Sequence, residues 1–119
     1  MAGYAPGDLV IAPFPYIEQE IGGKIRPALV LAVFAADVPA LPTDQVLILC
    51  EITSHVPRDA NDLVLETTDL QRGRLPQRST IRLSRIWTFA DQRVHRRVGV
   101  LTPAKWVSVA THLHRIFDV

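Results

Sequence analysis

Residues 46–53 read VLILCEIT, and this stretch decides the fold class. Its β-branched and apolar side chains favour a buried central strand. Further stretches of strand character lie on both sides of it, at residues 8–12, 28–33, 63–65, 79–83 and 94–101. The chain therefore predicts a mainly β protein.

Loops and turns are expected between these strands. Gly22-Gly23 suits a hairpin loop, because both residues tolerate a positive φ. Residues 34–45 form a long connection rich in Ala and Pro, residues 57–61 a turn, and residues 69–78 a polar loop. The alternation of residues 79–83 slips near Ser84-Arg85, which predicts a bend or bulge there.

The last segment changes from strand to helix period. Thr102 is a good N-cap and Pro103 fits the first helical position. Apolar residues then recur at spacings of three and four, which predicts a helix with one apolar face; they are Trp106, Val109, Ala110, Leu113, Ile116 and Phe117. We expect one domain over residues 1–119, a small barrel of about five to seven antiparallel strands with a C-terminal helix.

Composition excludes several classes of protein. With 119 residues and 48% hydrophobic residues the chain can form a core, so it is not disordered as a whole. The longest apolar run, residues 28–36, is too short for a membrane span, and the N-terminus lacks a signal pattern. We therefore expect a cytoplasmic protein without a membrane partner. The single cysteine, Cys50, excludes an internal disulfide and a Cys-rich metal site, and its apolar strand predicts a small buried hydrophobe.

The net charge of +1 hides an asymmetry between the two halves. Residues 1–69 hold three cations and ten acids, whereas residues 70–119 hold ten cations and two acids. Eleven of the thirteen cations are arginines, which bind phosphates and carboxylates with two bonds at once. A phosphate-bearing or acidic partner is one interpretation; pairing of the two halves inside one fold is the other.

Several kinds of chemistry lack their usual motifs. No Gly-rich phosphate loop occurs, so nucleotide hydrolysis is not expected. His112 and His114 are two residues apart on a helix and cannot share a metal on one face, and His55 and His95 are isolated. We expect no metal site and no cofactor.

Two short segments carry more information, KIRPALVL at residues 24–31 and EITS at residues 51–54. Together with GDLVIAPFPY before them and STIRLSRIWTF and GVLTPAKW after them, they resemble the MazF/PemK (Kid) family of bacterial toxins. The resemblance runs from Gly7 to about Leu113. Its most specific parts are Gly7-Asp8, Phe14-Pro15, Arg26-Pro27-Ala28 and Ile52-Thr53-Ser54.

The resemblance implies a homodimeric, metal-independent endoribonuclease with a small Src-homology-3-like barrel. Such toxins cut single-stranded RNA, usually mRNA, and an antitoxin with a mostly disordered tail neutralises them. The family's catalytic arginine falls on Arg26 and its catalytic Ser/Thr on Thr53. The loop of residues 16–25 is expected to cover the site.

The chemistry of these two residues fits that role. The 2′-OH of RNA attacks the adjacent phosphorus, and the enzyme must neutralise the charge that develops on the phosphorane oxygens. Arg26 suits this task because its guanidinium stays charged, which also makes it a poor general base. Thr53 would bond the phosphate through its hydroxyl.

We expect substrate contacts from Phe14, Tyr16, Lys24, Ser54, Arg82 and Arg85. Phe14 and Tyr16 could stack on bases, with core packing as the alternative for Phe14. Arg82 and Arg85 could hold phosphates or simply cover the barrel surface. The chain departs from the family at Pro13 and at residues 84–87 (SRIW), positions that help to choose RNA bases, so base specificity is not carried over.

Two other functions share this fold. One is a CcdB-like protein that poisons DNA gyrase without catalysis, and the other is a silent relative that only binds RNA or an antitoxin. The gyrase poisons act through C-terminal residues and usually end in a Trp-containing tail, whereas this chain ends HRIFDV and keeps Arg26 and Thr53. We therefore favour the nuclease. Its basic second half predicts an antitoxin with an acidic tail, encoded just upstream.

Overall fold

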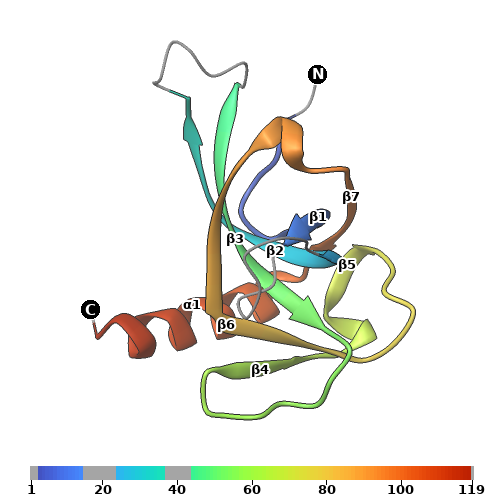
Figure 1. Ribbon diagram of the computed structural model, residues 1–119. Coiled ribbons are helices and arrows are strands. Elements are labelled where there is room, and N and C mark those ends of the chain that lie inside the picture. The colour runs from blue at the N-terminus through green and yellow to red at the C-terminus, as the bar shows by residue number, and fades with distance from the viewer. Residues whose placement is uncertain (1–2, 15–23, 37–43, 119) are drawn as a thin grey trace.

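A computed structural model describes residues 3–14, 24–36 and 44–118. Seven strands, one α-helix and two short 3-10 helices make up these parts of the chain (Figure 1). In chain order they are β1 (Asp8–Phe14), β2 (Lys24–Ala35), β3 (Gln45–Thr53), β4 (Asp62–Leu65), η1 (Thr67–Asp69), β5 (Leu70–Gly73), β6 (Ser79–Ala90), η2 (Asp91–Arg93), β7 (Arg96–Leu101) and α1 (Pro103–Phe117).

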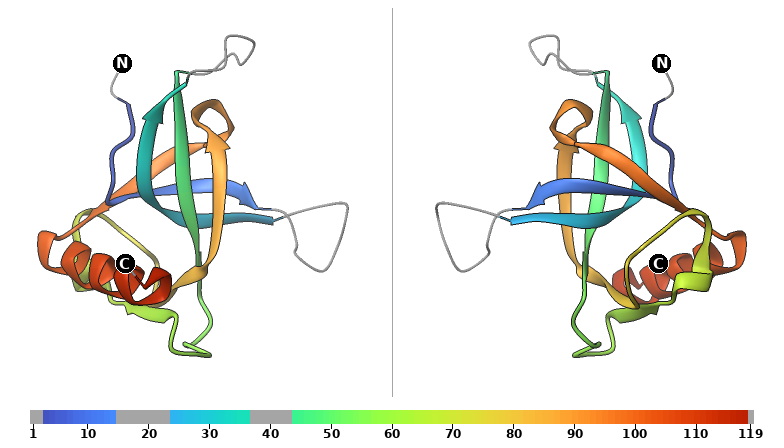
Figure 2. Two further views of the ribbon diagram at one scale, coloured as in Figure 1. Left: turned by 90° about the vertical axis from the view of Figure 1, so that its left-hand side faces the viewer. Right: turned by 90° about the vertical axis from the view of Figure 1, so that its right-hand side faces the viewer.

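The strands form one antiparallel sheet in the order β4-β6-β3-β2-β1-β7-β5. The sheet bends strongly into a half-barrel, and α1 lies across one side of it (Figure 2). Strand β3 is near the middle of the sheet, as its composition predicts. The mainly β fold with a C-terminal helix is confirmed.

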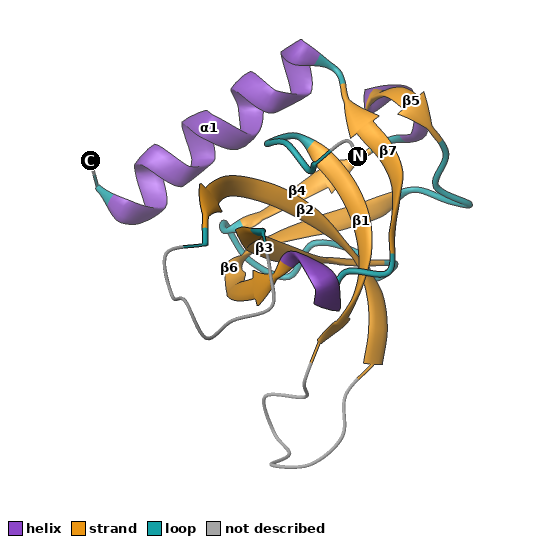
Figure 3. Ribbon diagram, turned by 90° about the horizontal axis from the view of Figure 1, so that it is seen from above, coloured by secondary structure: helices purple, strands orange, loops and turns teal. Residues whose placement is uncertain are grey.

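Alternation of side chains along each strand produces two apolar clusters, one on each face of the sheet. The first cluster includes Leu9, Leu29 and Ile52 and packs against Val109 of α1. The second includes their neighbours Val10 and Val30 and lies on the other face of the same strands. Figure 3 shows α1 on one side of the curled sheet only.

The helix begins as predicted. The hydroxyl of Thr102 accepts a hydrogen bond from the backbone N–H of Lys105 at 3.2 Å, and Pro103 is the first helical residue. Val109 is buried, while Trp106, Leu113 and Ile116 pack partly buried on the first cluster. Phe117 is exposed, so the predicted apolar face ends before it. Within the described parts of the chain no helix has the length and hydropathy needed to cross a membrane.

The predicted bulge in β6 is confirmed. Glu51 pairs with Arg82, but the preceding residue Cys50 pairs with Ile86, so β6 has three extra residues between these pairs. Because the extra residues bend β6, its two halves can belong to different parts of the sheet. One half pairs with β4 as well as β3.

Four strands differ in extent from the sequence prediction. β1 continues through Pro13 to Phe14, β2 covers residues 24–35, and β6 extends to Ala90. β7 begins at Arg96 rather than at residue 94, because residues 91–93 form η2. The connection predicted at residues 34–45 is therefore too long at both ends, because Phe34, Ala35 and Gln45 belong to strands. Its middle and the Gly22-Gly23 hairpin loop fall outside the described residues.

The prediction of a continuous polar loop over residues 69–78 is wrong. Leu70–Gly73 form the edge strand β5, which pairs with β7. Gly73 has a φ of 79° and faces Gly99 so closely that a Cβ on it would lie 2.0 Å from the carbonyl oxygen of Val98. This pairing depends on backbone approach rather than on apolar alternation, so the sequence pattern missed it.

Candidate active site

The register of β2 and β3 brings Arg26 and Thr53 to the same face of the sheet. Ala28 pairs with Glu51, and two residues further along each strand are Arg26 and Thr53. Side chains at i and i+2 of a strand share a face. Arg26 and Thr53 are therefore opposite each other, two residues beyond the Ala28–Glu51 pair. Among the contacts of the described residues, no direct hydrogen bond joins them.

Next to this pair, a row of alternating charge crosses four strands, and Arg26 joins it through its ion pair with Glu51. Arg82 of β6 lies opposite Glu51, and Asp62 of β4 lies opposite Arg82. We call Asp62, Arg82, Glu51 and Arg26 the charged row. It lies on the face away from α1, because Ile52 and Ile81, which alternate with its members, pack in the cluster under the helix.

Arg26 is held by a carboxylate. Its Nη1 lies 2.8 Å from Oε1 of Glu51, and the two side chains are 24% and 7% exposed. The other oxygen of Glu51 lies 3.9 Å from Nη1 of Arg85, which comes from the bulge of β6. The carboxylate thus lies between two arginines, and the Arg26 side chain remains partly exposed.

Thr53 ends β3 and is 8% exposed. Its Oγ1 accepts a hydrogen bond from the backbone N–H of His55 at 3.3 Å, so the hydroxyl proton itself is not used in that bond. Its β6 partner Thr80 donates to the carbonyl oxygen of His55 at 2.6 Å. These two bonds fix the turn that follows Thr53. Ser54 is exposed and lines a small hollow of about 70 Å³.

The arginines predicted to bind substrate are engaged with acids. Arg82 Nε lies 3.5 Å from Oδ1 of Asp62, an almost fully buried carboxylate. Both of these atoms lack a well-formed hydrogen bond. Asp62 also accepts from the backbone N–H of Arg58 at 2.9 Å. Arg82 and Arg85 therefore belong to the same charged face as Arg26, rather than to a separate surface.

Phe14 occupies the core. It is 2% exposed, and its ring packs edge-on against Trp87 and Phe89 at centroid distances of 6.2 and 5.2 Å. The core alternative is therefore the one that fits Phe14, and stacking on a base does not fit this conformation. Lys24 is exposed at the start of β2. Tyr16 lies outside the described residues.

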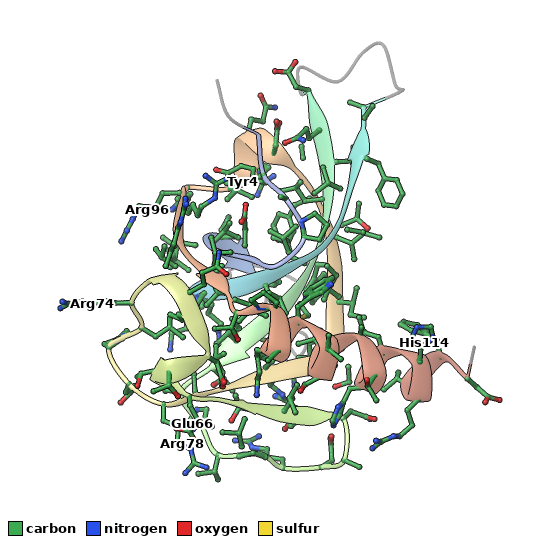
Figure 4. The ribbon with its side chains drawn as sticks, turned by 180° about the vertical axis from the view of Figure 1, so that it is seen from behind. Tyr4, Glu66, Arg74, Arg78, Arg96 and His114 are labelled. Carbon is green, nitrogen blue, oxygen red and sulfur yellow. The ribbon has the colours of Figure 1, made fainter. Side chains whose placement is uncertain are left out.

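Ion pairs between the two halves of the chain neutralise part of the charge asymmetry seen in the sequence. Each of five cations of the second half pairs with an acid of the first half: Arg78, Arg82, Arg85, Arg97 and Lys105. Figure 4 shows Arg78 beside Glu66, while Arg74 and Arg96 extend away from the ribbon. Pairing between the halves therefore accounts for part of the asymmetry, and exposed arginines remain on the surface.

Cys50 is fully buried, and desolvation by this burial raises the pKa of its thiol. The prediction of a small buried hydrophobe is confirmed. Sequence reasoning missed Glu51 and Asp62. A charged residue inside the apolar stretch VLILCEIT was the signal that could have identified Glu51.

The fold and the charged face define a class of small half-barrel proteins with one C-terminal helix, and comparison with known families identifies the chain further. The model of the PemK-like, MazF-like toxins of type II toxin-antitoxin systems matches residues 5–117. The chain belongs to this family.

Solved structures share the fold. One is an endoribonuclease in complex with its cognate antitoxin from Mycobacterial species, with a TM-score of 0.70 and 14% identity over 98% of this chain and 97% of that chain. Another is the Mycobacterium tuberculosis toxin MazF-mt6, with a TM-score of 0.63 and 20% identity over 92% of this chain and 97% of that chain. No curated protein sequence matches significantly.

Proposed function

We propose that this chain is an endoribonuclease toxin that cuts single-stranded RNA without a metal ion. The observation that carries the proposal is the place of Arg26. Its side chain is partly exposed on the face opposite α1, at the level of Thr53 in the strand register. Family membership supports a toxin with such an activity.

The proposed reaction uses the nucleophile that RNA carries. The 2′-OH attacks the neighbouring phosphorus, the bond to the 5′-oxygen breaks, and a 2′,3′-cyclic phosphate and a 5′-OH end result. Arg26 would donate hydrogen bonds to the non-bridging oxygens, whose negative charge grows in the transition state. Thr53 would donate a hydrogen bond from its hydroxyl to the same phosphate. Both residues are the proposed catalytic groups.

The arginines around this point would bind the flanking phosphates. Arg82 and Arg85 are held on the same face by Asp62 and Glu51, so their positions are ordered before RNA arrives. Lys24 and Ser54 are exposed near the ends of β2 and β3 and would extend this contact. We also propose that the protein acts in the cytoplasm as a homodimer.

The proposed partner is a cognate antitoxin with an acidic tail. One of the structural neighbours is an endoribonuclease bound to its antitoxin, which supports this kind of partner here. Exposed arginines outside the ion pairs, such as Arg74 and Arg96, offer charges for acidic side chains. An antitoxin tail that covered the charged row would also exclude RNA from it.

One assay distinguishes the candidate functions. The purified protein is incubated with a long single-stranded RNA in EDTA, and the products are separated on a gel. Discrete cuts that leave cyclic phosphate ends support the nuclease. RNA retention without cuts would indicate a binding protein instead, and inhibition of gyrase without cuts would indicate the gyrase poison.

A further inference from the structure

Glu51 lies between Arg82 and Arg26 in the charged row, and it has no role in the proposed reaction. Its side chain is 7% exposed. One carboxylate oxygen lies 2.8 Å from Arg26, and the other lies 3.9 Å from Arg85. In the strand register Glu51 also lies directly opposite Arg82. A single carboxylate is therefore shared by two arginines, while Arg82 beside it pairs with Asp62.

The fold does not require a charge at this position. Leu47 and Leu49 point to the same face of β3, are fully buried and belong to an apolar cluster. Burying a carboxylate in place of a packed apolar side chain gains little or no stability, since desolvation offsets the attraction to its partners. Glu51 is thus better explained by what it does to its arginine neighbours.

The contact with Glu51 orients Arg26. A guanidinium has five N–H donors in one plane, so a short bond to Nη1 restricts that plane and leaves other donors for a phosphate. Without the carboxylate, the positive side chains of Arg26 and Arg85 would repel each other and move apart. Orientation matters because a displacement of about 1 Å of a catalytic group can slow a reaction on the order of 10²-fold.

The same carboxylate opposes the binding of RNA. Its negative charge lies next to the arginines that would meet the phosphates, and it reduces the net positive charge of that face. Removal of the charge should strengthen the electrostatic part of RNA binding, which is measured by salt dependence.

We propose that Glu51 is a positioning residue that holds Arg26 in its reactive orientation and weakens the affinity for RNA in doing so. The inference rests on the proposed nuclease function. It predicts opposite changes in rate and in affinity when the charge of Glu51 is removed. A residue with a merely structural role would lower both.

The test uses the full chain with the substitution Glu51→Gln. Single-turnover cleavage of single-stranded RNA is measured in EDTA, and affinity is measured with 2′-O-methyl RNA, which lacks the nucleophile. We expect the cleavage rate to fall on the order of 10²-fold. We expect tighter binding, with the slope of log K against log[salt] steeper by up to about 0.7, the value for one additional phosphate contact with a single strand.

Two further variants serve as controls. Glu51→Asp keeps the charge but shortens the side chain, so it should slow cleavage while the affinity and its salt dependence stay as in the wild type. Glu66→Gln removes a carboxylate that is 47% exposed and lies 2.7 Å from Arg78, outside the charged row. It changes the net charge equally and should leave the cleavage rate unchanged. Thermal unfolding of each variant is followed by circular dichroism.

Each outcome decides the proposal. Slower cleavage with tighter binding in Glu51→Gln supports it. Wild-type rate and affinity in that variant overturn it, and so does a parallel loss of rate and affinity with early unfolding. If Glu51→Gln does not fold, wild-type cleavage by Glu51→Asp overturns the proposal and slower cleavage at unchanged affinity supports it. If the wild-type protein itself does not cut RNA, the proposed function fails first and this inference falls with it.

Discussion

The two ends of β3 have the same alternation but opposite chemistry on the face away from α1. In the first part of β3, which ends where β6 bulges, Leu47 and Leu49 pair with Phe89 and Trp87 in an apolar cluster. In the last part of β3, Glu51 and Thr53 pair with Arg82 and Thr80, and this part of the face is polar and charged. We call these two regions the apolar end and the charged end. Since both ends contain buried positions, burial alone does not explain the difference.

The difference shows where stability and function are separated in this sheet. The apolar end stabilises the fold by removing hydrocarbon from water. The charged end buries carboxylates that need arginine partners to offset their desolvation. Such a region is costly to maintain, and it carries the donors that the proposed reaction needs. Substitutions at the two ends should therefore affect different measurements.

The largest loss of stability is expected at the apolar end. Leu49→Ala would leave a cavity in a fully buried position and lower the free energy of unfolding by about 2–5 kcal/mol. Urea denaturation measures this loss. The rate of RNA cleavage per folded molecule should remain close to that of the wild type. A fall in that rate of tenfold or more would contradict the separation of the two ends.

The matching substitution at the charged end is Thr53→Val. It keeps the shape of the side chain but removes the hydroxyl, so cleavage should fall by about 10²–10³-fold, the usual cost of one donor to a developing oxyanion. Thr53→Ser keeps the hydroxyl and is the control, for which most of the rate should remain. Equal rates for the valine variant and the wild type would remove Thr53 from the proposed site.

A smaller effect is expected at the helix, which lies on the other side of the sheet. Thr102→Ala removes the N-cap and should lower the free energy of unfolding by about 1 kcal/mol, with no change in cleavage. Thr111→Ala, at an exposed position in the middle of α1, is the matched control and should change stability by less. Equal effects of the two substitutions would contradict the capping role of Thr102.

The smallest effect concerns Cys50, which precedes the charged end. Because burial raises the pKa of its thiol, the reactive thiolate is scarce and inaccessible in the folded protein. A thiol reagent such as 5,5′-dithiobis(2-nitrobenzoate) at pH 8 should not label the native protein and should label it fully in urea. Rapid labelling of the native protein would contradict the buried position of Cys50.

The fold was predictable from the sequence wherever periodicity reports burial. Residues 46–53 and the helix from Pro103 show clear patterns, and the slip near Ser84-Arg85 predicted the bulge. The edge strand β5 was not predictable in this way. Its pairing depends on the close approach of Gly73 and Gly99, and a single apolar residue among four carries no alternation.

The candidate site was predictable only in part. The motif around Arg26 and the ITS segment identified two positions, and the register places both on one face. The ion pairs of that face were not predictable, because Glu51, Arg82 and Asp62 come from three strands whose pairing depends on the bulge. For Phe14 the sequence did not decide between two roles, because an aromatic residue in a motif looks the same whether it packs in a core or stacks on a base.

The most direct test of the account is the rate at which Arg26→Ala cuts single-stranded RNA in EDTA, compared with the wild type. We expect a loss of at least about 10²–10³-fold in a protein that remains folded. Arg26→Lys should not restore the rate, because an ammonium ion pairs with Glu51 but lacks the planar donors of the guanidinium. Cleavage by purified Arg26→Ala at the wild-type rate would contradict the central claim.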